Sequence, residues 1–223
     1  MITSLLYSKH PTQLKFVMID PMRIEFTPYG KIERHFLTKM EPEEAIITDP
    51  YKAVDMLNIL CLEMDNRLEL QKEASVHNIA EYNEKFTSQQ LDSRHGHRYL
   101  PYIVVVIDEF ADLCMSVRKI ENLVARLASK GHAAGIHLII ATQRPDVKII
   151  SGLIKANFPA RIAFRVVSRI DSRTIIDSPG AEQLVGCGDM LVSIAGKITR
   201  VQGAWMTPKE TKRIVQFISE QKV

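Results

Sequence analysis

Strand-length apolar runs alternate along this chain with stretches in which apolar residues recur every three or four positions. The runs Leu14–Ile19, Tyr102–Ile107 and Ile136–Ala141 predict strands that are buried on both faces. Between the last two runs, one helical stripe is made of Ile120, Leu123, Val124, Leu127 and Ala128. A strand, a helix and a second strand in this order predict a right-handed parallel crossover, which is typical of α/β proteins.

Capping and turn residues predict the remaining elements. A long amphipathic helix is predicted from Asp49-Pro50, an N-cap followed by proline, to Gln71. The capping box Thr207–Glu210 predicts the last helix. The other expected elements are an opening segment Met1–Tyr7 that begins inside a helix, an exposed polar excursion Glu84–Tyr99, a short helix Ile149–Ile154, a strand Arg161–Val166, and a hairpin of Met190–Ile194 with Ile198–Gln202. No repeat or linker interrupts them, so we expect one α/β domain across residues 1–223.

The composition is that of a globular protein. The chain has 223 residues, of which 46% are hydrophobic, enough for one sizeable core. No apolar run is long enough to span a bilayer, and no secretory signal opens the chain. We therefore expect a cytoplasmic location and no membrane segment.

The charge of this chain is concentrated in one segment. The window from Arg144 to Arg173 holds seven basic and two acidic residues, a net charge of +5, whereas the whole chain carries +3. A basic segment on a nearly neutral body indicates a local contact with a polyanion, and a solvated basic face is the alternative.

The clearest candidate for chemistry is the pair Asp108-Glu109, which directly follows the run Tyr102–Ile107. Open α/β sheets place their ligand crevice at the carboxyl ends of strands. An acidic pair there has the form of a Walker B element, in which the aspartate orders the Mg²⁺ shell and the glutamate polarises the attacking water. A buried strand that simply ends in solvated acids is equally compatible with these residues.

Beyond that pair, the chain resembles the motor domain of the FtsK/SpoIIIE family of DNA translocases. The resemblance runs in order over nearly the whole chain and rests on Val106–Leu113, Ala134–Leu138, Ala141–Pro145, Gly152–Asn157, Arg161–Phe164, Ile170–Thr174 and Gly188–Leu191. It implies a RecA-like P-loop NTPase core with a mostly parallel sheet flanked by helices. It also implies a hexameric ring around double-stranded DNA, with ATP and Mg²⁺ bound between subunits.

The resemblance also assigns roles to single residues. It makes Asp108 the carboxylate that orders Mg²⁺ through water and Glu109 the catalytic glutamate, and Gln143 a sensor of the γ-phosphate. Arg144, Lys155 and Arg169 match positions that contact DNA phosphates in the ring's channel. The ordinary alternatives are a glutamine that satisfies backbone groups and cations paired with surface acids; Arg161, inside a predicted strand, is expected to be structural.

The chain departs from the family's pattern in three places. No GxxxxGK[ST] occurs in the sequence, so we expect the P-loop and its strand to lie before residue 1. The family has alanine and arginine in place of Gly131-His132, and histidine is a poor substitute for an arginine finger because it is shorter and mostly neutral at neutral pH. The strand ending Asp20-Pro21 is followed by Met22 where the family has lysine.

The resemblance leaves two hypotheses of different kinds. The first is a fragment of an ATP-driven double-stranded DNA translocase that serves chromosome segregation or cell division. The second is a truncated, non-catalytic relative that acts as a DNA-binding or ring-assembly module; a conjugative coupling or pilus-assembly ATPase fits the motifs less closely. We expect this chain alone to bind neither ATP nor Mg²⁺, to show no appreciable ATPase, and to self-associate through sheet edges left by the missing strand. The winged-helix module and the inner-membrane anchor of intact family members have no counterpart in it.

Overall fold

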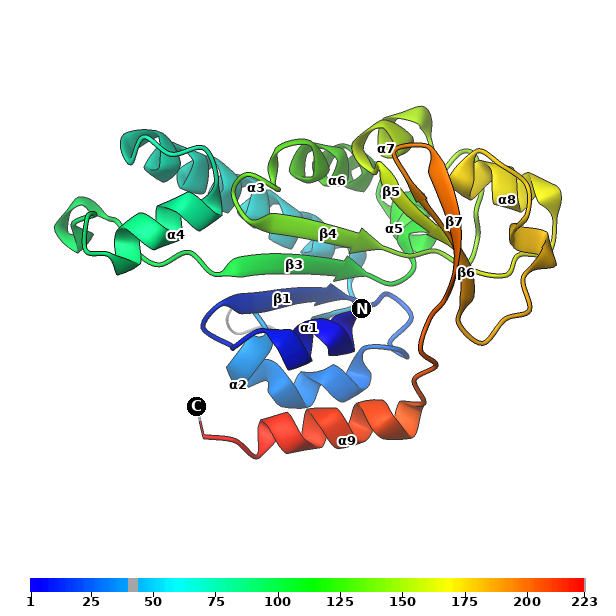
Figure 1. The fold of residues 1–223 in the computed structure, drawn as a ribbon, viewed down its shortest axis with the longest axis horizontal. Coiled ribbons are helices and arrows are strands. Elements are labelled where there is room, and N and C mark those ends of the chain that lie inside the picture. Colours follow the sequence, from blue (N-terminus) through cyan, green and yellow to red (C-terminus); the bar gives the residue numbers. More distant parts are fainter. Residues whose placement is uncertain (40–43, 223) are drawn as a thin grey trace. The chain divides into compact units, whose positions relative to one another are not determined.

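The computed structural model describes residues 1–39 and 44–222 (Figure 1). The chain divides into two compact units. The first consists of Met1–Ala141 with Thr211–Val223, and the second of Thr142–Glu210. The positions of the parts relative to one another are not determined, so each unit is described by itself.

The first unit contains a four-stranded parallel sheet in the order β2-β1-β3-β4. Its strands are β1 (Leu14–Ile19), β2 (Ile46–Ile47), β3 (Tyr102–Ile107) and β4 (Ile136–Ile140). Ile19 pairs with Ile107 and Ile107 with Ile140, so these strands end level with one another. The predicted crossover between β3 and β4 is confirmed, and it contains two helices, α5 (Phe110–Ser116) and α6 (Lys119–Lys130).

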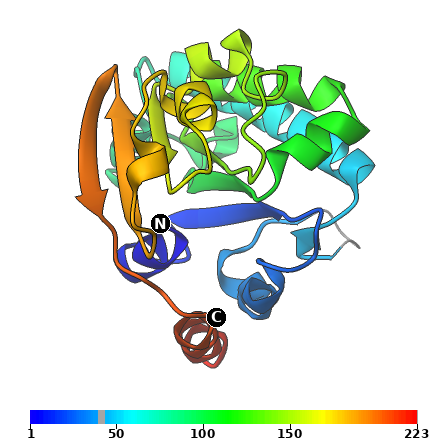
Figure 2. The same cartoon turned by 90° about the vertical axis from the view of Figure 1, so that its right-hand side faces the viewer.

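Helices cover both faces of this sheet (Figure 2). On one side lie α3 (Pro50–Glu73) and α6, and on the other α1 (Ile2–Ser8), η1 (Thr27–Ile32), α2 (Glu33–Phe36) and α9 (Pro208–Ser219). Alternate residues of β1 and β3 face the second group. That core contains Leu6, Phe16, Met18, Ile32, Phe36, Val104, Val106 and Val215. The predicted parallel α/β core is therefore confirmed.

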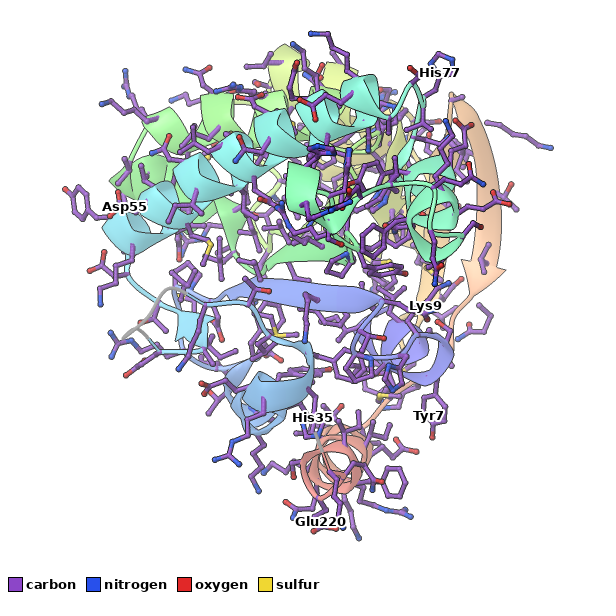
Figure 3. All side chains as sticks on the ribbon, turned by 90° about the vertical axis from the view of Figure 1, so that its left-hand side faces the viewer. Tyr7, Lys9, His35, Asp55, His77 and Glu220 are labelled. Atoms are coloured by element: carbon purple, nitrogen blue, oxygen red, sulfur yellow. The ribbon has the colours of Figure 1, made fainter. Side chains whose placement is uncertain are left out.

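The last helix and the residues that follow it contact η1 and α2 through polar groups as well as through the core. His35, labelled beside α9 in Figure 3, has Nε2 3.1 Å from the carbonyl oxygen of Gln221. Lys31 Nζ donates to Gln216 Oε1 at 3.0 Å. The predicted start of α9 is confirmed, because Thr207 and Glu210 cap it reciprocally.

Helix α3 begins where the sequence predicts. The Asp49 carboxylate accepts the backbone N–H groups of Tyr51 and Lys52 at 2.7 and 3.2 Å. Near its other end, the buried Arg67 donates to the carbonyl oxygens of Pro101 and Ala134 at 2.8 and 3.1 Å. These carbonyls lie just before β3 and β4, so α3 fixes the entry to both strands.

The excursion predicted at Glu84–Tyr99 is more ordered than expected. Its first residues complete α4 (Ile79–Thr87), and a short η2 (Ser93–His95) follows. The amide of Asn83 bonds both backbone groups of Leu100, with Nδ2 to the carbonyl oxygen at 2.8 Å and the N–H to Oδ1 at 2.9 Å. These two bonds hold the segment against the start of β3. Across the described residues, the structure contains no helix that is long and apolar enough to cross a membrane.

The second unit is an antiparallel sheet with short helices. Its strands lie in the order β5-β6-β7, with bounds Ala160–Ala163, Asp189–Ile194 and Lys197–Gln202, and its helical segments are α7 (Gly152–Asn157), α8 (Arg169–Ile176) and η3 (Ala181–Gln183). The predicted hairpin is confirmed. The strand predicted at Arg161–Val166 is shorter, and the helix predicted at Ile149–Ile154 begins only after Ser151, whose hydroxyl accepts the Ile154 N–H.

Candidate functional site

Acidic residues gather at the carboxyl edge of the parallel sheet. Asp108 and Glu109 directly follow β3, as the sequence predicts, and the backbone N–H of Asp108 donates to the carbonyl oxygen of Ile19 at 3.0 Å. Asp20 directly follows the neighbouring β1. Because β1 and β3 are parallel and end level, the sheet brings Asp20 and Asp108 together.

Asp20 organises the loop beside this edge. Its buried carboxylate accepts the backbone N–H groups of Met22 and Arg23 on Oδ1, at 3.1 and 2.9 Å, and that of Phe26 on Oδ2 at 3.0 Å. Met22, the residue that departs from the family's pattern, contributes this backbone contact while its side chain is exposed. Sequence reasoning missed the role of Asp20, although an acid at the end of a buried strand was the available signal.

The Asp108 carboxyl group lies in an environment that disfavours its charge. Burial, the largest cause, and the like charges of Asp20, Glu25 and Glu109 together raise its pKa to about 6. Carboxylate oxygens are the ligands that Mg²⁺ takes, and a divalent cation relieves this kind of repulsion. Among the described residues, no group of three or more His, Cys, Asp or Glu side chains is arranged to hold a metal ion by itself. A Mg²⁺ ion at this edge would therefore need other ligands, and Asp108 would contact it through a water molecule.

Glu109 has a visible structural contact. Its buried side chain accepts the backbone N–H of Ala111 on Oε1 at 3.3 Å, as the N-cap of α5. The helix cap fixes the carboxylate beside Asp108. Polarisation of a water by Glu109 stays a prediction, and a variant that keeps the cap is needed to test it.

The predicted γ-phosphate sensor and the predicted DNA contacts lie in the second unit. Gln143 and Arg144 follow β4 and Ala141 in the chain, where the Ala141 carbonyl accepts the Phe110 N–H at 2.9 Å. Within that loop the Arg144 N–H donates to Thr142 Oγ1 at 3.1 Å. The position of Gln143 relative to Asp108 is not determined, because the two residues belong to different units.

The predicted DNA contacts Lys155 and Arg169 are held in ion pairs. Lys155 Nζ lies 2.6 Å from Asp177 Oδ1, and Arg161 Nη2 lies 2.7 Å from Asp177 Oδ2. The exposed Arg169 lies 3.3 Å from Glu182 through its Nε. Part of the positive charge counted in the sequence is therefore neutralised inside the unit.

Comparison with known proteins identifies the family. Residues 1–147, more than half of the chain, match the model of the FtsK/SpoIIIE family. The chain belongs to the FtsK/SpoIIIE family. It is 48% identical to the DNA translocase FtsK of Chlorobaculum tepidum over 99% of this chain and 27% of that protein, and 46% identical to that of Helicobacter pylori strain J99 over 100% and 25%. The chain thus spans about a quarter of the length of these relatives.

Solved structures share the fold of this FtsK/SpoIIIE chain. The pCW3 conjugation coupling protein TcpA, solved as a monomer with ATPgS, is 25% identical and aligns with a TM-score of 0.75 over 97% of this chain and 59% of that one. EssC (ATPases 2 and 3) from Geobacillus thermodenitrificans aligns with a TM-score of 0.78 at 18% identity, over 98% and 40%. The predicted P-loop ATPase fold is confirmed by these likenesses.

One departure from the family's pattern has a structural reason. Gly131 ends α6 so close to β4 that an added Cβ would lie 2.5 Å from the carbonyl oxygen of Leu127 and 2.7 Å from that of Ile136. The family's alanine would therefore need a shift of backbone here. The next residue, His132, is exposed. The pKa of His137 is lowered mainly by burial and to a smaller degree by the charge of His132.

The phosphate-binding part of an FtsK-type site has no match in these residues. Neither Gly30-Lys31 nor Gly196-Lys197 belongs to a GxxxxGK[ST] motif. Gly30 lies within η1, and Gly196 lies in the turn between β6 and β7. These two Gly-Lys pairs therefore do not form a phosphate cradle of the P-loop type.

Proposed function

We propose that this chain is part of the motor domain of an ATP-driven double-stranded DNA translocase that serves chromosome segregation or cell division. The acidic edge of the sheet is the observation that carries the proposal, because it gathers Asp108, Glu109 and Asp20 at the carboxyl ends of two parallel strands. In this proposal Asp108 would hold Mg²⁺ through water in the intact motor, and Glu109 would be positioned as the base for the attacking water. Gln143 reports the phosphate state to the DNA-binding loops.

The second unit supplies the contacts to DNA in this proposal. Arg144, Lys155 and Arg169 bind backbone phosphates, and the +5 window supports this assignment independently of the family. Contacts of this kind are electrostatic and indifferent to base sequence, as a motor that moves along any DNA requires. We further propose a cytoplasmic protein that joins a hexameric ring of like subunits.

A DNA-binding measurement tests the proposal. Arg144→Ala with Lys155→Ala should weaken binding of a fluorescent duplex of about 30 base pairs roughly tenfold at low salt, and flatten the salt dependence by about 0.9 per lost contact. Arg118→Ala with Lys119→Ala removes the same charge from exposed positions outside the basic window. Equal weakening by both double variants, or an effect limited to some duplex sequences, would contradict the assignment.

A second measurement concerns ATP turnover. We propose that the chain alone does not hydrolyse ATP appreciably, since it holds no phosphate cradle and has His132 where an arginine finger is expected. A coupled ATPase assay with added duplex DNA checks this. Glu109→Gln keeps an oxygen that accepts the Ala111 N–H, so it preserves the cap while removing the base. Turnover that this variant abolishes would overturn the proposal.

A further inference from the structure

One carboxylate in the second unit is shared by two cations. Lys155 Nζ donates a hydrogen bond to Asp177 Oδ1 at 2.6 Å. Arg161 Nη2 forms an ion pair with Asp177 Oδ2 at 2.7 Å. The three residues come from different elements: Lys155 from α7, Arg161 from β5, and Asp177 from the position directly after α8. All three lie in the same unit, so their mutual geometry is defined.

Asp177 is the outermost member of this cluster. Its side chain is 55% exposed, whereas those of Lys155 and Arg161 are 25% and 18% exposed. Its backbone has φ 59° in the left-handed region, a conformation that aspartate and asparagine adopt more readily than most residues. The carboxylate therefore covers the two cations on their solvent side.

In the cluster of Lys155, Arg161 and Asp177, some hydrogen-bond donors have no acceptor among the described residues. Two cations share one negative charge, and the Arg161 atoms Nε and Nη1 are buried without a hydrogen-bond partner in the described part of the chain. Ser193 lies directly opposite Arg161 across β5 and β6 and is 1% exposed, and its Oγ likewise has no hydrogen-bond partner among the described residues. The cluster carries a net positive charge and could take a further anion.

The neighbouring ion pairs do not share these properties. The carboxylates of Glu182 and Asp189 each also accept a backbone N–H, from Gly180 and Val185, both at 2.8 Å. Moving either acid would break a turn of the chain. Among the described residues, the bonds to the Asp177 carboxylate come from Lys155 and Arg161, so its displacement breaks no backbone contact in that part of the chain.

We propose that Lys155 Nζ and Arg161 Nη2 form a site for a DNA phosphodiester, and that Asp177 is an internal counter-ion that a phosphate must displace. A phosphodiester presents two anionic oxygens and one negative charge, as the carboxylate does, so it can take the place of Asp177 on the same two donors. This inference rests on the proposed function. It adds Arg161 to the proposed DNA contacts. It also implies that Asp177 lowers the affinity for duplex DNA, because its carboxylate competes with the phosphate.

Asp177→Asn tests the inference, because asparagine tolerates the left-handed backbone and removes only the charge. In the 223-residue chain it should tighten binding of a fluorescent duplex of about 30 base pairs roughly threefold to tenfold at about 100 mM salt. The salt dependence should steepen by about one unit of slope, since cations held by Asp177 now meet phosphates. Circular dichroism and the unfolding midpoint verify that the variant is folded.

Two further variants isolate the mechanism. Asp146→Asn removes the same charge from an exposed position in the same unit; Asp146 Oδ1 accepts the Lys148 N–H at 2.7 Å, which asparagine also does. This control should change affinity less than about twofold. Lys155→Ala with Asp177→Asn should lose most of the gain, because the released cation is gone.

The outcomes separate the inference from the function on which it rests. Asp177→Asn that binds no tighter than Asp146→Asn overturns the inference, and the proposed function stands if Arg144→Ala with Lys155→Ala still weakens binding. If that double variant binds like the wild type, the proposed DNA contacts fail independently. Absence of duplex binding by both the wild type and Asp177→Asn at about 50 mM salt would overturn both.

Discussion

Two aspartates at strand ends experience opposite environments in the two units. Asp108, directly after β3, is partly buried among Asp20, Glu25 and Glu109, and its pKa is raised to about 6. Asp189, the first residue of β6, faces the guanidinium of Arg200 at 2.9 and 2.7 Å, which together with the Val185 N–H lowers its pKa to about 2. In the first unit Asp108 thus lies beside further acids, whereas in the second unit Asp189 lies against an arginine.

This difference distinguishes acids that stabilise the fold from acids that belong to a candidate binding site. Ion pairs such as Asp189–Arg200 satisfy both partners and hold strands together. The burial and like charges that raise the pKa of Asp108 cost folding free energy, and such costs persist where function needs them. The paired acids of the second unit therefore report its architecture, with Asp177 as the exception for which we propose a role in binding, and the acidic edge of the first unit indicates where an external cation is expected.

Asp20 differs from Asp108 although both lie at the acidic edge, because the Asp20 carboxylate accepts three backbone hydrogen bonds. Asp20→Ala should cost about 3 kcal/mol of unfolding free energy, since three backbone N–H groups lose a charged acceptor in a buried site. Urea unfolding near neutral pH measures it. Asp49→Ala, which removes two such bonds at the exposed cap of α3, should cost only about 1 kcal/mol. A smaller loss for Asp20→Ala than for Asp49→Ala would show that the loop contacts are not stabilising.

The sequence predicts the acidic edge because local signals specify it. Buried runs fix β1 and β3, and the position of Asp108-Glu109 at the end of β3 follows directly. Asp20 was missed since an Asp-Pro pair after a strand indicates a turn, and its three backbone contacts depend on how the next six residues fold. The positions of Asp108 and Glu109 are confirmed, and their chemical roles stay predictions.

The charges of the second unit could not be predicted in the same way. The basic window is visible in the sequence, but the pairing of Lys155 with Asp177 joins residues 22 positions apart and depends on how α7, β5 and α8 pack. Periodicity also cannot give the direction of a four-residue strand such as β5, which pairs antiparallel with β6. Formal charge therefore overstates the number of cations available to DNA.

The ion pair of Asp189 with Arg200 gives a test based on the pH dependence of stability. Its folded-state pKa lies below the value of an unfolded aspartate, so it contributes stability above about pH 4 that is lost as the pH falls through about 2. Asp189→Asn should lower the urea midpoint near pH 7, by less than Asp20→Ala does, and the difference from wild type should shrink near pH 3. Asp146→Asn, at an exposed position, serves as the control. An equal deficit at both pH values would mean that packing, not charge, explains the loss.

Replacement of Asp108 at the acidic edge should change stability in the opposite direction to replacement of Asp189, because the pKa of Asp108 is raised and that of Asp189 is lowered. Its folded-state pKa is raised, so the folded protein binds more protons than the unfolded chain between about pH 4 and 6, and stability falls as the pH rises through that range. Because the group is only partly buried, solvent screening reduces the cost to about 1 kcal/mol. Asp108→Asn should therefore raise the unfolding free energy by about that amount near pH 7.5 in EDTA and leave it unchanged near pH 4. An asparagine variant that is less stable than wild type near pH 7.5 would show that a cation of the chain itself stabilises the Asp108 carboxylate.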